Sequence, residues 1–322
     1  ADEAVNKLIE VDPLSVVGRI NYYSNHLAEI DPEAARAGAQ QLVEQHPWAG
    51  FSTLARIAMV EGELTEALYW SLRAYAVDPL DRWSNQFMVG RFCDVEMVEE
   101  ARRVSDVTSM QAEAFCGDRG KAITMLERQM QVDPDNTFIA RFLPSLHYWK
   151  GDKATALAGW REIAEGEGDL PMIGGGYGLT LHLHFAWLLQ QSGNPQAADR
   201  ELAKIDRDLR ARGDTATSRY SNLTWDRGLR EMLAGDREAA LDYFEQSVDD
   251  YFYSRNLFDD PMVASLQGNP RFEALRSRVD DILDREREKI LKLICLDNPV
   301  PNSWQPLAET CAEVATVARQ GP

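Results

Sequence analysis

The sequence predicts an all-α fold built from helical hairpins that repeat along the chain, and three observations support this class. Five segments share a glycine that is followed directly by an acidic residue or Asn and, five residues after the glycine, by an alanine. Asp-Pro or a similar dipeptide recurs where a helix would have to stop, and both marks recur at a spacing of 34 residues. One helix-turn-helix unit of this length cannot bury its apolar face alone. We therefore expect neighbouring hairpins to share one continuous core.

The first mark predicts a tight turn inside each hairpin. Glycine tolerates the left-handed conformation that ends a helix, and the acidic or Asn residue that follows it suits the start of the next helix. The alanine then falls on the second helix, where a small side chain lets paired helices approach closely. The five pairs are Gly62 with Ala67, Gly117 with Ala122, Gly151 with Ala156, Gly193 with Ala198 and Gly235 with Ala240.

The second mark closes each hairpin with a proline, which stops one helix and can open the next. Pro13 and Pro47 are 34 residues apart, as are Gly117 and Gly151, and this sets the period. The breaks lie at Asp12-Pro13, Asp31-Pro32, His46-Pro47, Asp78-Pro79 and Asp133-Pro134.

Parts of the chain depart from this period. The turn glycines Gly62 and Gly117 are 55 residues apart, so residues 80–106 are expected to form a degenerate or shortened hairpin without a turn glycine. The later turn glycines are 42 residues apart, which predicts longer helices or loops. Because no Lys or Ser/Thr follows the glycines near 171–178, we interpret that stretch as a flexible joint and not as a phosphate cradle.

The chain ends in a different pattern. The array is expected to span residues 1–255 in about seven to eight hairpins, and residues 256–322 to form a capping helix and tail, because the last apolar face of an array needs a cover. Within the tail, Asp297 to Trp304 is expected to be a linker that leads into a weak helix ending at Arg319. The apolar residues of the predicted cap are Phe272, Leu275, Val279, Ile282 and Ile290.

The segment WAGFSTLARIAMVEGELTEALYWSLRAYAVDP, Trp48 to Pro79, resembles the tetratricopeptide repeat family. Leu54 and Ala55 fit its first-helix pair, Gly62 its turn, and Ala67 its small second-helix residue. The resemblance covers roughly residues 1 to 250 and implies a right-handed alpha-alpha superhelix. If Pro13 closes a unit, Ala1 takes the second-helix position, so the chain is expected to begin inside a longer protein.

A second, shorter resemblance concerns the segment FDDPMVASLQGNPRF, Phe258 to Phe272. It is similar to the ending of repeat regions in bacterial membrane-tethered winged-helix transcriptional regulators and in some nucleotide cyclases. This resemblance implies the sensory part of a larger signalling protein and a periplasmic location. Without it, a cytoplasmic location is expected.

Charge excludes some partners. The chain has 52 Asp and Glu against 34 Lys and Arg, a net charge of -18, which repels phosphate backbones and anionic lipids. We therefore predict no nucleic-acid binding. Membrane insertion is not expected either, because the longest nearly apolar stretch, Leu179 to Leu189, is too short for a membrane helix. A basic peptide or protein is one possible partner, although acidity also simply favours solubility.

Catalytic and metal-binding signatures are missing: the sequence has no GxSxG, HExxH, P-loop or GxGxxG ahead of a helix. We therefore predict no enzymatic activity, no cofactor and no metal. The cysteines show no CxxC pair, and structural thiols are the default interpretation. Cys295 and Cys311 would close a Pro-containing loop, but a core of this size does not require a bridge. The other two are Cys93 and Cys116.

Some polar residues could belong to a functional site, but their spacing does not identify one. His182 and His184 are two residues apart, so on a helix they point in different directions and are expected to pack or to line a groove. The pairs Asp249-Asp250 and Asp259-Asp260 are interpreted as solvated helix caps, because an acidic chain contains such pairs by composition.

The repeat-family resemblance implies that first helices line a concave face, where aromatic side chains and arginines anchor peptides. Packing between helices is the alternative role for these residues. Counting back from the turn glycines selects Arg56, Met59, Phe138, Arg141, Tyr148, Trp149, Trp187 and Trp225.

The function we predict is a non-catalytic protein or peptide interaction module, the sensory or scaffolding part of a larger bacterial regulatory protein. One alternative is a small-molecule sensor or a hydrolytic enzyme with a closed site near Gly174 to Gly178. Another is a stand-alone assembly scaffold, which would self-associate, for example as a homodimer.

Overall fold

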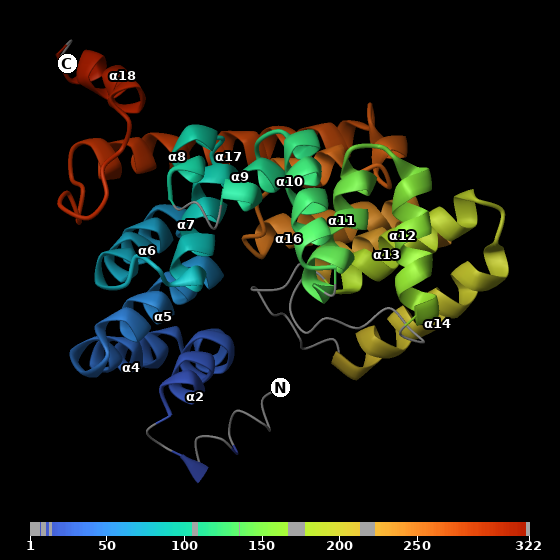
Figure 1. Cartoon of the computed structure of the whole chain (residues 1–322), viewed down its shortest axis with the longest axis horizontal. Coiled ribbons are helices and arrows are strands. Elements are labelled where there is room, and N and C mark those ends of the chain that lie inside the picture. Colours follow the sequence, from blue (N-terminus) through green and yellow to red (C-terminus); the bar gives the residue numbers. More distant parts are fainter. Residues whose placement is uncertain are drawn as a thin grey trace. The chain divides into compact units, whose positions relative to one another are not determined.

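The computed structural model describes residues 7, 11–12, 15–104, 109–134, 136–166, 178–212 and 223–319 (Figure 1). These residues form helices and no strand, and successive helices pack against each other, so the predicted all-α class of helical hairpins is confirmed. The chain divides into two compact units. Unit 1 comprises Ala1–Cys116 and Asp280–Pro322, and unit 2 comprises Gly117–Val279.

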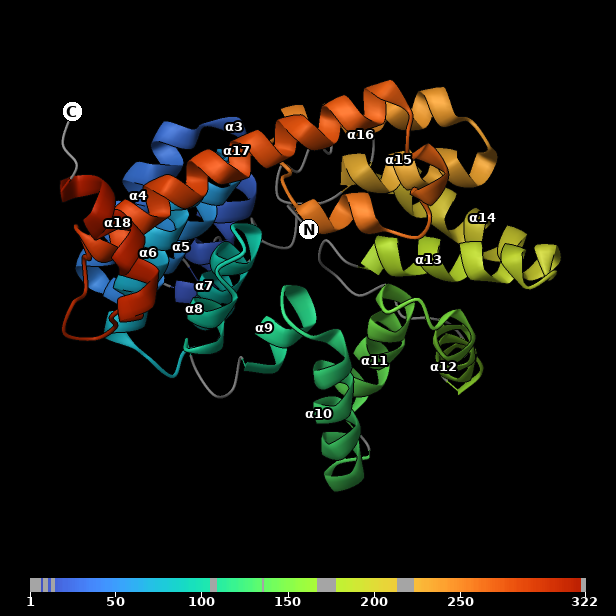
Figure 2. The same ribbon diagram turned by 90° about the horizontal axis from the view of Figure 1, so that it is seen from above.

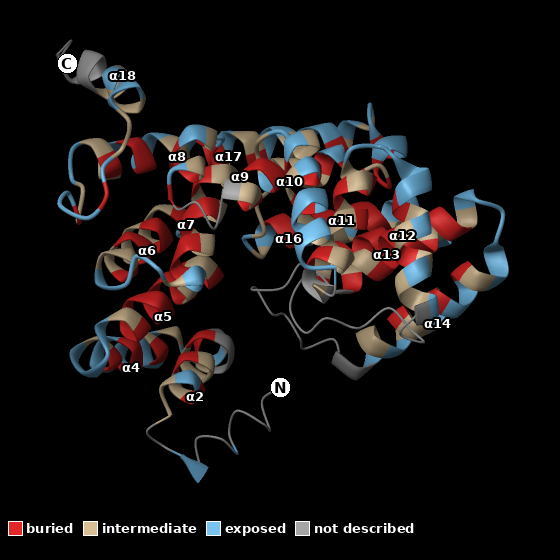
Figure 3. Cartoon of the chain, viewed as in Figure 1, coloured by how far each residue is buried: buried red, intermediate tan, exposed pale blue. Residues whose placement is uncertain are grey.

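Unit 1 is a succession of helices in which α4 packs on α5, α5 on α6, α6 on α7 and α7 on α8. The buried residues lie on the sides of the helices that face neighbouring helices (Figure 3). Its helices are α2 (Val16–Asn21), a π-helical turn (Tyr22–Leu27), α3 (Ala28–Ile30), α4 (Pro32–Gln45), α5 (Pro47–Val60), α6 (Leu64–Val77), α7 (Arg82–Asp94), α8 (Val98–Arg102), α9 (Ser109–Phe115), the second part of α17 (Pro270–Cys295) and α18 (Ala308–Arg319).

In the part of unit 2 that the structure describes, α11 pairs with α12, α13 with α14 and α15 with α16, and the first helices α13 and α15 also pack on each other. Most of the stretch predicted as a joint, 171–178, lies outside the described residues, and Gly178 begins α13. The helices are α10 (Arg119–Val132), α11 (Thr137–Trp149), α12 (Lys153–Gly166), α13 (Gly178–Gln191), α14 (Pro195–Arg212), α15 (Leu223–Ala234), α16 (Arg237–Asp249), the 3-10 turns Arg255–Asp259 and Ala264–Leu266, and the first part of α17.

The predicted turn chemistry is present at most hairpins. The alanines of all five glycine-alanine pairs are buried, which fits the close approach of paired helices. Gly117 alone among the five glycines lacks a positive φ. Positive φ angles occur at Gly62 (78°), Gly151 (87°), Gly193 (75°) and Gly235 (84°). The side chains of Asp118, Asp152, Asn194 and Asp236 accept main-chain N–H bonds from the helix that follows.

The hairpin α7–α8 lies in the stretch 80–106 and has a second helix of only 5 residues. Its turn contains no glycine; Glu96 adopts a positive φ of 58° instead. A non-glycine residue in this conformation is uncommon, because its Cβ crowds the backbone. The turn between α7 and α8 therefore forms although the side chain of Glu96 disfavours its backbone conformation.

Helix α17 contributes to the cores of both units (Figure 2). In unit 2, Phe272 contacts Phe244 and Phe258, with ring centroids 6.5 and 5.3 Å away. In unit 1, Ile290 and Ile294 are buried in the core that α6 to α8 form. The unit boundary falls inside this helix, so the division differs from the expected array of residues 1–255 with a separate cap.

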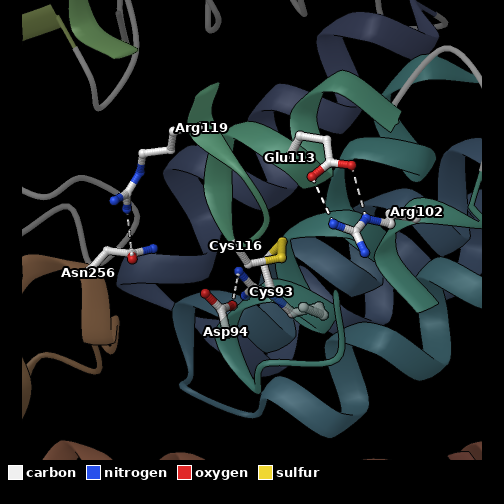
Figure 4. Close-up of a disulfide and its surroundings, with 8 residues drawn as sticks. Cys93, Asp94, Arg102, Glu113, Cys116, Arg119 and Asn256 are labelled. Atoms are coloured by element: carbon white, nitrogen blue, oxygen red, sulfur yellow. Dashed lines mark hydrogen bonds and ion pairs between the residues drawn. A yellow bond between two sulfur atoms is a disulfide. The ribbon is translucent and has the colours of Figure 1, made fainter. Parts of the chain in front are cut away.

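All four cysteines are paired, which corrects the default interpretation as free thiols. Cys93 pairs with Cys116, and Cys295 pairs with Cys311, both within unit 1. Figure 4 shows the first bridge, with the carboxylate of Glu113 facing an arginine nearby. None of the described helices is both long and apolar enough to span a membrane.

Candidate functional site

An aromatic site in unit 2 is built on α11, α12 and α13. Tyr148, in the last turn of α11, stacks on His184 of α13 with ring centroids 4.1 Å apart. Trp149, Trp160 and Trp187 surround this pair, with centroids 5.7, 5.9 and 6.0 Å from the Tyr148 ring. These five residues define the aromatic site.

The helical period explains why these rings meet. His184 and Trp187 are three residues apart on α13 and therefore share one face of the helix. His182, two residues before His184, points elsewhere, and its Nδ1 lies 3.2 Å from the carboxylate of Glu201 on α14. Both histidines are buried, so of the two expected roles, packing and lining a groove, the structure shows packing.

The buried carboxylate of Asp260 contacts two members of the aromatic site, Tyr148 and His184. Asp260 accepts a hydrogen bond from the Tyr148 hydroxyl at 2.5 Å and one from the Met262 amide at 2.9 Å. Its second oxygen lies 2.8 Å from Nε2 of His184. Tyr148, His184 and Asp260 are 0%, 3% and 1% exposed. A buried hydrogen-bond network whose members are all paired is rigid, so it fixes the orientation of the rings that it contacts.

The protonation of this network follows from its surroundings. Burial alone would raise the pKa of Asp260, but His184, the Tyr148 hydroxyl and the Met262 amide together lower it below the ordinary value. Burial, together with the Asp260 charge, raises the pKa of Tyr148 well above 10.0. Tyr148 therefore stays a neutral donor and Asp260 stays an ionised acceptor.

The outer face of the aromatic site is half-buried and carries two cations. The Arg119 guanidinium lies 5.6 Å from the Trp149 ring centroid and donates to Oδ1 of Asn256 at 3.2 Å (Figure 4). Nζ of Lys153 lies 4.4 Å above the Trp187 ring. Trp149 and Trp187 are both half-buried, whereas Lys153 is exposed. Among the residues the structure describes, neither cation forms an ion pair with a carboxylate.

Three carboxylates close to these cations in sequence or by charge interaction have other partners. Asp118 and Asp152 cap the first turns of α10 and α12. Asp259, which partly offsets the lowering of the Arg119 pKa by burial, forms an ion pair with Arg276 at 3.2 Å. The cations on the two tryptophans are therefore available to a carboxylate from outside the chain.

Three of the predicted groove residues meet in the aromatic site: Tyr148, Trp149 and Trp187. Tyr148 is fully buried, so it supports the site from within and does not line an open groove. Trp149 and Trp187 keep part of their surface exposed. Arg141 is half-buried on α11, outside the aromatic site as defined above.

The other candidates lie apart from it. Trp225 is fully buried and packs on Phe244 with centroids 4.1 Å apart, so it is a core residue and not a groove residue. The Phe138 side chain lies outside the described residues. Arg56 and Met59 are half-buried on α5 of unit 1.

The sequence left several important residues unassigned. The interpretation of Asp260 as a solvated cap is wrong, because its side chain is buried; nothing near it in the sequence distinguishes it from Asp259. Its partner Tyr148 is 112 residues away. Arg119 and Lys153 follow the N-cap aspartates of α10 and α12, a position that predicts exposure but not contact with tryptophan.

No protein-family model matches the chain, and no curated protein matches it at a significant level.

Proposed function

We propose that this chain is a peptide- or protein-binding module of the tetratricopeptide repeat type and that Trp149 and Trp187 contact its partner. One observation carries the proposal: the first helices of two successive hairpins each present a half-buried tryptophan, over a buried network that holds both. Large rings fixed before binding lose little conformational freedom, which is why tryptophan is a frequent binding anchor.

The partner we propose carries carboxylates at this site. Arg119 and Lys153 lie on the two tryptophans and form no ion pair with any residue that the structure describes, so an acidic side chain next to an apolar one would complement the surface. This differs from the basic partner suggested by the net charge of -18. The local charges at a contact matter more than the distant ones, because salt screens beyond about 8 Å.

The two disulfides support an oxidising compartment as the place of action, because such bridges persist outside the reducing cytosol. A periplasmic sensory region of a larger bacterial regulator satisfies that requirement. This assignment rests on the short resemblance in Phe258 to Phe272 and remains part of the proposal.

Selection from a display library of random 12-residue peptides tests whether Trp149 and Trp187 contact a bound peptide. We expect clones enriched on the wild-type chain to bind the Trp149→Ala, Trp187→Ala double variant at least about tenfold more weakly. Trp83→Ala is the matched control, because Trp83 is a 65% exposed tryptophan of unit 1 and should leave binding unchanged. Clones that bind the double variant as well as they bind the wild type would refute the assignment of this site.

The same clones test the charge of the partner. Acidic sequences should dominate, and Lys153→Glu should weaken their binding while Lys7→Glu, at an exposed lysine of unit 1, should not. Enrichment of basic clones that still depend on both tryptophans would keep the binding role and overturn the acidic partner.

A further inference from the structure

The C-terminal strap, residues 296–319, lies on a face formed by the end of α7, the following turn and α8. Val300 and Trp304 of the strap are 7% and 6% exposed and belong to the same core as Phe92, Val95 and Met97. The Trp304 ring stacks on Phe92 with centroids 5.4 Å apart. We call this surface the strap face.

Polar contacts hold the main chain of the strap. Glu100 of α8 is 1% exposed, and its Oε1 accepts bonds from the Leu307 amide at 2.8 Å and the Thr310 hydroxyl at 2.6 Å. The Arg103 guanidinium donates to the Gln305 carbonyl at 3.2 Å. Glu100 therefore caps the start of α18, as an anionic side chain at a helix N-terminus should.

The strap is held in the way that proteins hold a separate peptide. Between the end of α17 and the start of α18 it forms only a turn and extended chain, with prolines at Pro299, Pro301 and Pro306. One aromatic anchor fills an apolar site, and side chains of the strap face bind the main chain on either side of it. An anchor combined with main-chain hydrogen bonds is a common way to recognise extended peptides.

The Cys295–Cys311 disulfide determines which strap can lie there. Cys295 ends α17, whose preceding turns are anchored in the unit 1 core through Ile290 and Ile294. With the bridge closed, the segment between the two cysteines is tied to its own chain at both ends. With the bridge open, the strap is tied covalently only at Cys295, and only the noncovalent contacts described above hold its far part.

We propose that the strap face is a docking site for the strap of a second copy of this chain, and that reduction of Cys295–Cys311 makes the exchange possible. The second copy is the occupant because its strap repeats every contact described above, as in domain swapping. The opening step is thiol-disulfide exchange with a dithiol reductant. The reductant gives up two electrons and two protons and becomes a disulfide, while the cysteines become two thiols.

The proposal is tested with a fluorescein-labelled peptide of residues 296–319 carrying Cys311→Ser. The receptor is the full chain with Cys295→Ser and Cys311→Ser, which open the bridge, and Trp304→Ala, which weakens its own strap. We expect fluorescence anisotropy to show binding at least about tenfold tighter than to the oxidised wild type. The same peptide with Trp304→Ala should lose this binding.

The other bridge supplies the matched control. Removing it with Cys93→Ser and Cys116→Ser leaves the strap closed, so this variant should bind the peptide no better than the oxidised wild type does. A receptor with unchanged helical circular dichroism that does not bind the peptide would overturn the proposal, as would equal binding to the oxidised wild type.

A second measurement decides the matter if the triple variant does not fold. Light scattering after size exclusion should show that the Cys295→Ser, Cys311→Ser chain becomes dimeric as its concentration rises, whereas the Cys93→Ser, Cys116→Ser chain does not. The dimer should disappear when Trp304→Ala is added. If the chain with the open bridge stays monomeric at every concentration, the exchange does not occur.

Discussion

Asp259 and Asp260 are sequence neighbours in opposite environments. Asp259 is exposed and pairs with Arg276, whereas Asp260 is buried between Tyr148 and His184. Breaking a buried charged network leaves its remaining members without partners, which costs far more than losing a surface ion pair. The two positions therefore form a natural comparison.

We expect Asp260→Asn to destabilise unit 2 by about 3 kcal/mol. The amide offers one acceptor oxygen and one NH2 donor where the carboxylate offers two acceptors, so a donor replaces the acceptor that faces either His184 or the Tyr148 hydroxyl. Hydrogen exchange of the α11 and α13 amides measures the change. Asp259→Asn is the control and should cost less than about 1 kcal/mol; equal effects of the two substitutions would contradict the assigned network.

Asp94 predicts a dependence of stability on pH. Burial raises its pKa from 3.8 to about 6, and Arg91 offsets only part of this. The folded chain then binds more protons at Asp94 than the unfolded chain, so this residue makes unit 1 less stable as pH rises from about 4 to about 6. Asp94→Asn removes the effect, and its stability relative to the wild type should rise over that range by at most about 3 kcal/mol.

Urea unfolding of the wild type and of Asp94→Asn at pH 4 and at pH 7 measures this difference. Because the other carboxylates titrate in both proteins, only the change in the difference between them reports on Asp94. A difference that stays the same at the two pH values would show that the pKa of Asp94 is not raised.

At the scale of elements, two glycines in unit 1 illustrate how close the helices lie. A Cβ at Gly50 of α5 would lie 2.3 Å from the backbone nitrogen of Val43 on α4, whereas a Cβ at Gly90 of α7 would meet nothing within 4 Å. Gly50→Ala must push the two helices apart, because neither backbone can move aside as a side chain can.

We expect Gly50→Ala to destabilise unit 1 by about 1–3 kcal/mol. Gly90→Ala should instead stabilise it by about 0.5–1 kcal/mol, because alanine favours a helix and has free space there. Thermal unfolding followed by circular dichroism distinguishes the two. Shifts of the same sign would contradict the packing of α4 on α5.

Among the elements, the sequence predicts the turns and helix caps but not the packing of helices that are far apart in the chain. Turn glycines such as Gly151 and caps such as Asp152 act within a few residues of themselves, so their effect can be recognised locally. The position of α17 cannot, because its apolar residues are compatible with many partners. Glu286 of α17, for example, accepts bonds from the Thr65 amide and hydroxyl, 221 residues away.

The residues of the candidate site could likewise be predicted only in part. Repeat spacing placed Trp149 and Trp187 on first helices, where the structure finds them half-buried. The same counting also selected Trp225, which is in the core, because spacing along one helix does not say which neighbours cover it. The role of Asp260 depends on contacts between segments that are far apart in the sequence, so it could not be identified from the sequence.

At the scale of the whole molecule, both disulfides lie in unit 1. Each closes a loop whose entropy in the unfolded chain is worth about 3 kcal/mol. We expect a dithiol reductant to lower the stability of unit 1 and to leave that of unit 2 unchanged. Hydrogen exchange with and without reductant, compared for α7 and α15, measures this; a parallel loss in both helices would contradict the assignment.

Unit 1 is formed by two separated segments, and unit 2 is the continuous stretch between them. A ribosome therefore makes all of Gly117–Val279 before it makes Ile290 and Ile294, which complete the core of unit 1. All residues of unit 2 are thus made before the core of unit 1 can close, and until then the early helices α6 to α8 keep an apolar face uncovered. The segment made first is thus the one completed last, and it is the one that most needs protection from aggregation as the chain emerges.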